Sequence, residues 1–199
     1  MDKKDNRQIY YNVFQDWRAN AKNPSGRIIM LCFRVAKWTR SSLTLTILFF
    51  WYLVIYKACI EWLTGVEISL SATLGRGLRL ESGRGTMIDN ETVIGVNCTI
   101  RQLTTIGRKK LIDNTFSSPP VIGDRVDIGV NVTVIGNIDI GNNVVLGAGT
   151  VITKSVSDNS VMVGNPARLL KKVYDFAGFE DHERKIAEVQ PNVSLLDRV

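Results

Sequence analysis

Aliphatic residues recur at every sixth position through the middle of the chain. Between residues 122 and 152 they are Ile122, Ile128, Val134, Ile140, Leu146 and Ile152, and Gly directly follows four of them. A period of six fits neither an α-helix nor an isolated strand. It fits a solenoid of short strands and tight turns, in which the aliphatic side chains point inward and fill the core.

The same spacing predicts where the solenoid begins, is interrupted and ends. Earlier aliphatic positions in phase are Ile68, Leu74 and Leu80, followed after two extra residues by Ile88, Ile94, Ile100 and Ile106. The period is lost over residues 108–120, which read RKKLIDNTFSSPP. Long insertions in solenoids usually form projecting loops on a binding face. Since Pro166 prevents another regular strand, we expect a solenoid over residues 65–170, with a projecting loop at 108–120 and a polar tail at 171–199.

Residues 1–64 are expected to form an N-terminal helical region. A break at residues 23–26 (NPSG) predicts helices on either side, and Gly65 is expected to end the last one. The uncharged segment Leu43–Tyr56 is shorter than the roughly 20 residues of a membrane span. We expect it to pack against the solenoid or a neighbouring subunit. The alternative is contact with a membrane surface through residues 38–63, where Trp, Lys and Arg flank the apolar run.

Composition indicates a folded protein with anionic ligands. The 199 residues are 45% hydrophobic and 22% charged, with a net charge of +6 that favours phosphates, nucleotides, anionic glycans or membrane surfaces. Three cysteines without metal-ligand spacing indicate free thiols in a reducing compartment and no metal site. No secretory signal is visible, so we expect a cytoplasmic protein, with the inner face of the membrane as the alternative. We expect no nucleic-acid partner.

Several motifs in order carry a family resemblance. They are GVEI, GRGLRLESGRG, TIRQLTTIGR, the hexads from residue 122 and VGNPAR. Over about residues 14–172 the chain resembles the hexapeptide-repeat acyltransferases, in the serine acetyltransferase branch. It is closer still to the acetyltransferases of exopolysaccharide and colanic acid synthesis. The resemblance implies a mainly β fold, a left-handed parallel β-helix behind the helical region, assembled as a homotrimer that transfers acetyl groups from acetyl-CoA to a hydroxyl.

The resemblance also implies where acetyl-CoA binds, in a groove between two coils. Its residues along the pantetheine and at the phosphate end are Gly129, Gly147, Ala148, Lys154, Pro166 and Arg168. Small residues admit the pantetheine arm to the backbone, whose N–H groups can bind the thioester oxygen as charge develops. Lys and Arg can meet the phosphates. The alternative is that each Gly only permits a turn.

The sequence departs from this family at the catalytic base. Acyl transfer to a hydroxyl needs a proton acceptor, which is usually His. In the family that His follows an acidic residue before Gly-x-Gly, and here Glu81-Ser82 stand in those places. Two further family histidines are replaced by Gln102 and by Pro119 or Ser118. The only histidine, His182, lies in the tail.

Carboxylates remain as candidate replacements for the base. Glu81 is the favoured one, Glu67 matches an Asp that orients the family base, and Ser82 cannot act unaided. Delivery of His182 from an adjacent subunit is the less favoured alternative. Three functions stay open: an O-acetyltransferase acting on a sugar of capsular or exopolysaccharide biosynthesis, a catalytically silent trimeric scaffold, and a serine O-acetyltransferase. The sequence does not identify the acceptor.

Overall fold

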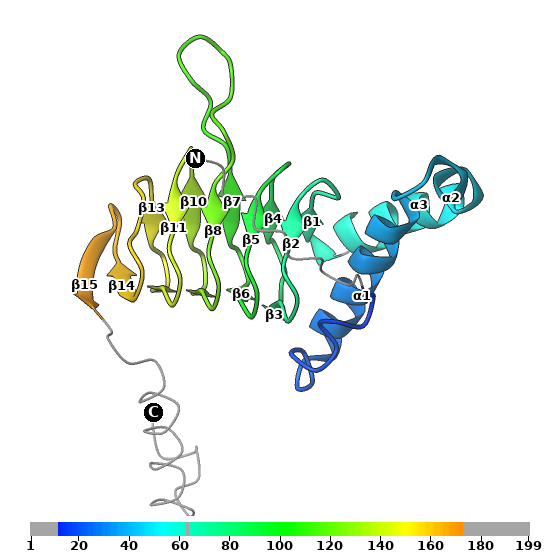
Figure 1. Cartoon of the computed structure of the whole chain (residues 1–199), viewed down its shortest axis with the longest axis horizontal. Coiled ribbons are helices and arrows are strands. Elements are labelled where there is room, and N and C mark those ends of the chain that lie inside the picture. Colours follow the sequence, from blue (N-terminus) through cyan, green and yellow to red (C-terminus); the bar gives the residue numbers. More distant parts are fainter. Residues whose placement is uncertain (1–11, 63, 173–199) are drawn as a thin grey trace, which may run out of the picture.

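The computed structural model describes residues 12–62 and 64–172, and its main body is a coil of short strands. Three sheets form the sides of this coil (Figure 1). Sheet A contains β1 (Glu67–Ile68), β4 (Met87–Ile88), β7 (Thr105–Gly107), β10 (Thr133–Ile135) and β13 (Val151–Ile152). Sheet B contains β2 (Thr73–Leu74), β5 (Val93–Ile94), β8 (Val121–Ile122) and β11 (Asp139–Ile140). Sheet C contains β3 (Arg79–Glu81), β6 (Thr99–Arg101), β9 (Asp127–Ile128), β12 (Val145–Leu146), β14 (Ser160–Val163) and β15 (Arg168–Lys172).

The hexad positions form the core, as the period of six predicts. Every aliphatic hexad residue from Ile68 to Ile152 is at most 5% exposed. The fifth hexad positions also point inward, and Cys98 is one of them. Burial raises the pKa of the Cys98 thiol to about 11, which suits a packing residue better than a reactive one. Strand β15 pairs antiparallel with β14 and so ends the parallel ladder of sheet C. The predicted β-solenoid behind N-terminal helices is confirmed.

Two threonine hydroxyls are buried in this core without a hydrogen-bond partner among the described residues, those of Thr92 and Thr150. By contrast, the Thr104 hydroxyl donates to the Arg101 carbonyl at 2.8 Å. Replacing Thr150 with Val removes a desolvated hydroxyl and keeps the side-chain shape. We therefore expect the free energy of unfolding to rise by about 1 kcal/mol. Urea unfolding measures this free energy. Thr104→Val is the matched control and should lower the same quantity by about 1 kcal/mol; a loss of stability in Thr150→Val would contradict this account.

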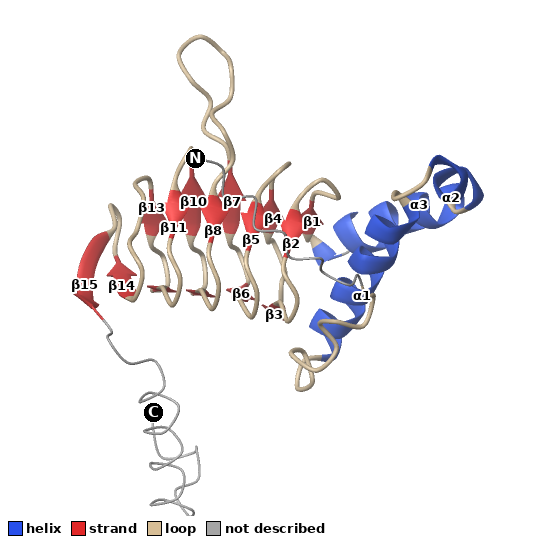
Figure 2. Ribbon diagram, in the orientation of Figure 1, coloured by secondary structure: helices blue, strands red, loops and turns tan. Residues whose placement is uncertain are grey.

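The helical region lies at the end of the coil that carries β1 (Figure 2). It comprises α1 (Pro24–Thr39), α2 (Leu43–Leu48), α3 (Phe50–Tyr56) and a π-helix (Lys57–Trp62). Asn23 caps α1 by accepting a hydrogen bond from the Gly26 N–H at 3.2 Å. Gly65, at φ +65°, donates to the Glu61 carbonyl at 2.9 Å and ends the last helix, as predicted.

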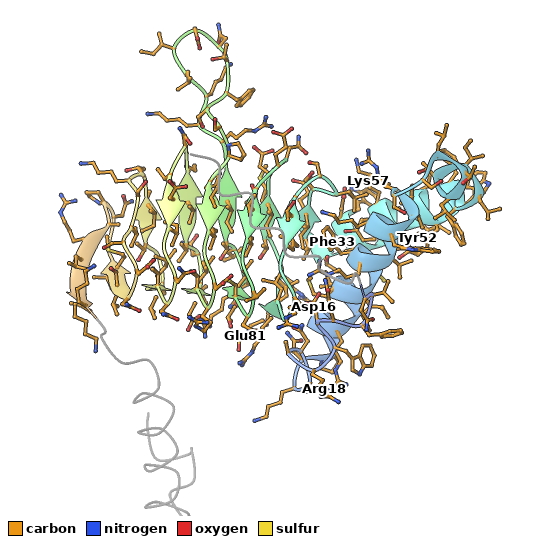
Figure 3. All side chains as sticks on the ribbon, in the orientation of Figure 1. Asp16, Arg18, Phe33, Tyr52, Lys57 and Glu81 are labelled. Atoms are coloured by element: carbon orange, nitrogen blue, oxygen red, sulfur yellow. The ribbon has the colours of Figure 1, made fainter. Side chains whose placement is uncertain are left out.

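The expected helix before Asn23 is wrong, because residues 13–22 form successive turns. Their polar side chains bind the coil instead. Asp16 accepts from the Leu78 N–H at 3.0 Å, and Asn20 accepts from the Leu80 N–H at 2.9 Å while donating to the Leu78 carbonyl at 2.8 Å. These side chains take the place of another turn of coil along the edge strand β3. Figure 3 shows Asp16 at this junction.

The segment Leu43–Tyr56 is not buried against the chain's own solenoid. Tyr56 is buried, but Leu43, Leu48 and Trp51 are 77%, 75% and 74% exposed. A neighbouring subunit or a membrane surface could cover this segment instead, and its apolar sequence is compatible with both. Among the described residues, no helix is both long and apolar enough to cross a bilayer.

The insertion at residues 108–120 projects from the coil, as its loss of period predicts (Figure 1). Lys110 and Phe116 form an isolated antiparallel bridge that closes the loop on itself. At the loop's base, the Arg108 guanidinium donates to Asp89 at 2.8 and 3.2 Å. These hydrogen bonds hold the pKa of Asp89 below its usual range. The loop is therefore tied to sheet A where it leaves the coil.

Candidate functional site

The candidate site lies along one edge of the coil, where the strands of sheet C lead into those of sheet A. We call it the C–A edge, and it consists of residues 82–86, 102–104, 129–132 and 147–150. Backbone hydrogen bonds stack its turns: Leu103 donates to Arg84 at 2.9 Å, and Asn131 donates to Gln102 at 3.0 Å. Successive turns lie about 4.8 Å apart, as neighbouring strands do.

Residues predicted for catalysis and for cofactor binding meet on the C–A edge. Glu81 pairs with Arg101, Ile100 with Ile128, and Ile128 with Leu146. This register aligns one row across the turns, Glu81, Arg101, Gly129 and Gly147. The hydrogen bonds between turns align a second row, Arg84, Gln102, Val130 and Ala148, and Ser82 stands in the two-residue insertion before Arg84. The coil thus brings residues 81–82 and 147–148 onto one edge although they are far apart in the chain.

The backbone of the C–A edge offers free hydrogen-bond donors. At the edge between sheets B and C, the N–H groups of Val96, Asp124 and Asn142 donate to a side-chain oxygen of the next turn at 2.7–2.8 Å. At the C–A edge, no described residue accepts a hydrogen bond from the N–H of Val130 or Ala148. Small residues without a hydrogen-bonding side chain follow in the next turn, so these N–H groups stay open to a ligand oxygen.

Glycine at position 129 is also explained by the stacking of the coil. A Cβ there would meet the Ala148 nitrogen and the Leu146 carbonyl oxygen at 2.7 Å. At Gly147 it would meet a Val163 methyl carbon at 2.9 Å. Both glycines are therefore needed by the fold, and their contact with a cofactor stays a prediction. Ala148 is exposed on the edge, which makes it the better probe of a ligand there.

The residues predicted for the phosphate end do not all lie on this edge. Residues 164–167 cover its last turn, where Gly164 accepts from Val151 and Ala167 donates to Val151, both at 3.1 Å. Pro166 belongs to this segment, and the exposed Arg168 begins β15 beside it. Lys154 is exposed beyond β13, at the opposite end of that strand. Pro166 and Arg168 thus share the C–A edge with Ala148, whereas Lys154 lies on the next edge of the coil.

Glu81 is held in an ion-pair ladder across the face of sheet C. One carboxylate oxygen accepts from Arg101 at 2.8 Å, and the other pairs with Arg79. Arg101 also pairs with Asp127 on the next strand. Ser82 follows with φ +60° on the exposed turn. Figure 3 shows Glu81 on the side of the coil away from Lys57. Since each Glu81 oxygen already forms an ion pair with a guanidinium, taking a proton would require giving up an ion pair.

Glu67 flanks the same edge from sheet A. Its N–H donates to the Thr86 carbonyl at 2.8 Å, next to the turn that carries Ser82. Its side chain is exposed and forms no ion pair with a described residue. It lines a groove of about 660 Å³ between the helices and sheet A, together with Lys57, Glu61 and Asp89. Glu67 therefore belongs to this groove, at the end of β1 nearest the C–A edge.

Glu61 is a further titratable residue of the groove, one that the sequence did not reveal. Burial raises its pKa, the charge of Glu67 raises it further, and Lys57 lowers it. A carboxylate with a raised pKa inside a groove is a candidate proton acceptor. Glu61 lies in the π-helix before the hexads begin, where no motif marks it.

The described residues contain no histidine, because His182 lies outside them. Gln102, in the place of one family histidine, lies on the C–A edge, and Ser118 and Pro119 end the projecting loop. No group of three His, Cys, Asp or Glu side chains in this part of the chain could hold a metal ion. A proton acceptor from the described residues would therefore be a carboxylate.

Similarity to known proteins extends over most of the chain. Residues 119–154 match the hexapeptide repeat of succinyl-transferase. The chain is 35% identical over 161 residues to WcaB of Escherichia coli K12, whose name describes an acetyltransferase of colanic acid biosynthesis. This match covers 79% of the chain and 98% of WcaB. The chain is also 32% identical to the serine acetyltransferase of Synechococcus elongatus, over 69% of the chain and 56% of that enzyme.

Solved structures show the same relationship. Soybean serine acetyltransferase without ligand superposes with a TM-score of 0.68 and 28% identity, covering 79% of this chain and 67% of that one. The Brucella abortus serine acetyltransferase in complex with coenzyme A superposes with a TM-score of 0.66 and 25% identity, covering 81% and 67% of the two chains. The structural relatives thus share the fold of this chain, and one of them was solved in complex with coenzyme A.

Proposed function

Since this chain belongs to the hexapeptide-repeat acetyltransferases, in the serine acetyltransferase-like group that includes WcaB, we propose that it is an acetyl-CoA-dependent O-acetyltransferase. Its acceptor is a sugar hydroxyl in the biosynthesis of a capsular or extracellular polysaccharide. The similarity to WcaB over 98% of that protein supports this acceptor class over serine, since the serine acetyltransferase of Synechococcus elongatus is covered over only 56% of its length.

The observation that carries the proposal is the C–A edge with its free N–H groups beside a carboxylate-lined groove. Acetyl-CoA lies along the edge, with its phosphates toward Arg168 and its thioester toward Glu67. The small side chain of Ala148 leaves room beside the backbone, and the open N–H groups of Val130 and Ala148 donate to amide oxygens of the pantetheine arm as it runs along the edge. The acceptor sugar occupies the groove that Glu67 lines.

Glu67 is the proton acceptor in this proposal. Its carboxylate takes the proton of the sugar hydroxyl while the hydroxyl oxygen attacks the carbonyl carbon of the thioester. The carbon–sulfur bond then breaks, and the proton passes from Glu67 to the departing sulfur of CoA. Glu81 was the candidate from sequence, but its two ion pairs suit it to holding Arg101 in place. We assign Ser82, on the exposed turn after Glu81, to contact with the acceptor.

A matched pair of substitutions tests the binding edge. Ala148 and Arg76 are both exposed and both stand two residues after an inward-pointing leucine, on different edges of the coil. Ala148→Glu places a bulky negative charge on the C–A edge and should weaken CoA binding at least about tenfold, measured by calorimetry. Arg76→Glu changes the net charge more and should leave binding unchanged. Equal losses in both variants would mean that CoA responds to overall charge and not to this edge.

The catalytically silent scaffold is the second candidate function, and the loss of the family histidines favours it. It differs from the first in one measurement, the release of free CoA from acetyl-CoA in the presence of sugar acceptors. An enzyme releases CoA in proportion to acceptor, whereas a scaffold binds CoA without releasing it. The same assay with L-serine covers the third candidate.

A further inference from the structure

Helices α2 and α3 run back along α1 and form a hairpin with it, through contacts such as Tyr52 with Cys32 and Thr46 with Thr39. The chain leaves the apolar outer side of this hairpin uncovered. Residues 41–56 contain no charged side chain. Outward-facing members of this hairpin include Leu43, Ile47, Leu48 and Trp51, each at least 70% exposed. The hairpin projects beyond the β1 end of the coil (Figures 1 and 2). A contiguous apolar surface of this kind marks contact with another protein or with a membrane.

The hydroxyls of Thr44, Thr46 and Tyr52 all have hydrogen-bond partners within the helical region. The Thr46 hydroxyl donates to the Thr39 and Ser42 carbonyls at 3.1 and 2.9 Å. The Thr44 hydroxyl pairs with that of Ser42 at 2.8 Å, and the Tyr52 hydroxyl donates to the Cys32 carbonyl at 3.0 Å. Entry into an apolar phase therefore leaves no hydroxyl of α2 or of Tyr52 without a partner, which is the condition that hydrocarbon imposes.

The charge around the hairpin favours one of the two kinds of partner, another protein or a membrane, over the other. From residue 17 to residue 60 the chain has no acidic residue and seven basic ones: Arg18, Lys22, Arg27, Arg34, Lys37, Arg40 and Lys57. Arg34 is buried against Asp16, so the other six supply the positive charge of this region. Arg40 and Lys57 are exposed at the two ends of the apolar segment. Two copies of this region facing one another would bring like charges together, whereas an anionic surface would attract them. Exposed Trp38 and Trp62 lie beside these cations, as aromatic residues do at membrane interfaces.

We propose that the apolar segment Leu43–Tyr56 of this hairpin docks the protein onto the surface of an anionic lipid bilayer. Helices α2 and α3 have six and seven residues, so they lie in the interface and do not cross it. Arg40, Phe50 and Lys57 lie within or beside the apolar segment and also line the groove that contains Glu67. Docking therefore turns the groove to face the bilayer surface, where a lipid-linked glycan would present its sugar. The identity of this acceptor rests on the proposed function, whereas the docking itself does not.

Vesicle flotation with the full-length protein tests the docking. Binding should be about tenfold stronger, or more, to vesicles of phosphatidylcholine mixed with phosphatidylglycerol than to phosphatidylcholine alone, because Arg40 and Lys57 each add attraction. Ile47→Asp should weaken binding to the mixed vesicles at least about tenfold. The control is Ile112→Asp on the projecting loop, another fully exposed isoleucine at the tip of an extension, which should bind like the wild type.

Two results would overturn the docking proposal. One is a wild-type protein that does not float with the mixed vesicles, or an Ile47→Asp variant that floats equally well. The other is an Ile47→Asp variant that lowers the assembly state in sedimentation velocity without changing flotation, which would make the hairpin a contact between copies. Flotation does not depend on catalysis, and Ile47→Asp should release CoA normally with a water-soluble sugar acceptor. Failure of CoA release in the wild type would count against the proposed function alone.

Discussion

Replacing Asp16 with Ala is expected to lower the free energy of unfolding by about 3–5 kcal/mol. Arg34 is 1% exposed and donates to Asp16 at 2.7 Å, to the Leu74 carbonyl at 2.9 Å and to the Gly75 carbonyl at 2.7 Å. The substitution removes the carboxylate that balances this buried guanidinium. It also removes the acceptor of the Leu78 N–H at the edge of β3. Urea unfolding followed by circular dichroism measures the change.

Two further variants isolate the charge of the pair. Asp113, on the exposed projecting loop, is bonded only within its own turn, so Asp113→Ala should change the free energy of unfolding by less than about 0.5 kcal/mol. Replacing the pair together, as Asp16→Leu with Arg34→Met, should recover part of the loss because no unbalanced charge stays buried. If Asp16→Ala and Asp113→Ala cost the same, the N-terminal segment is not anchored through this pair.

Replacing Glu67 with Gln is expected to lower kcat for acetyl transfer by about 100-fold or more. Gln keeps the size and hydrogen-bonding reach of Glu but cannot take the acceptor proton. KM for acetyl-CoA should stay close to the wild-type value, because Glu67 lines the groove with the helices and does not belong to the turns of Gly129 and Ala148. Steady-state kinetics with a sugar acceptor separates the two parameters.

Comparison with the neighbouring carboxylates makes the assignment specific. Glu81→Gln should lower kcat less, because Glu81 is already held by Arg79 and Arg101. Glu61→Gln should also lower kcat less, because it removes a neighbouring carboxylate and leaves that of Glu67 in place. A larger loss in Glu81→Gln than in Glu67→Gln would return the role of base to Glu81.

The coil could be predicted from the sequence because one hexad corresponds to one short strand and one turn. A residue such as Ile128 must then point inward together with every sixth neighbour, and the structure buries all of them. The alignment of Glu81 with Gly147 follows from the same count once the inserted loop is set aside. Local periodicity was therefore enough for the solenoid and for the placement of the C–A edge.

The helical region could not be predicted to the same depth, because long-range partners decide it. Residues 13–22 have the spacing of a helix, yet Asp16 and Asn20 bind carbonyl and amide groups of Leu78 and Leu80, about sixty positions later in the chain. Glu61 acquires its role only from the groove that folding creates. The exposure of α2 and α3 could not be predicted either. An apolar run has the same sequence pattern whether a subunit, a membrane or the chain's own coil covers it.

The most direct test of the central claim is mass spectrometry of a sugar acceptor incubated with the protein and isotopically labelled acetyl-CoA. Oligosaccharides of colanic-acid type are the acceptors to begin with, because the chain is similar to WcaB over nearly all of that protein. The proposed function predicts a labelled acetyl ester on a sugar hydroxyl, formed by the wild type and nearly lost in Glu67→Gln. A protein that binds CoA and leaves every sugar acceptor unlabelled would contradict it, and one that also leaves L-serine unlabelled would support the silent scaffold.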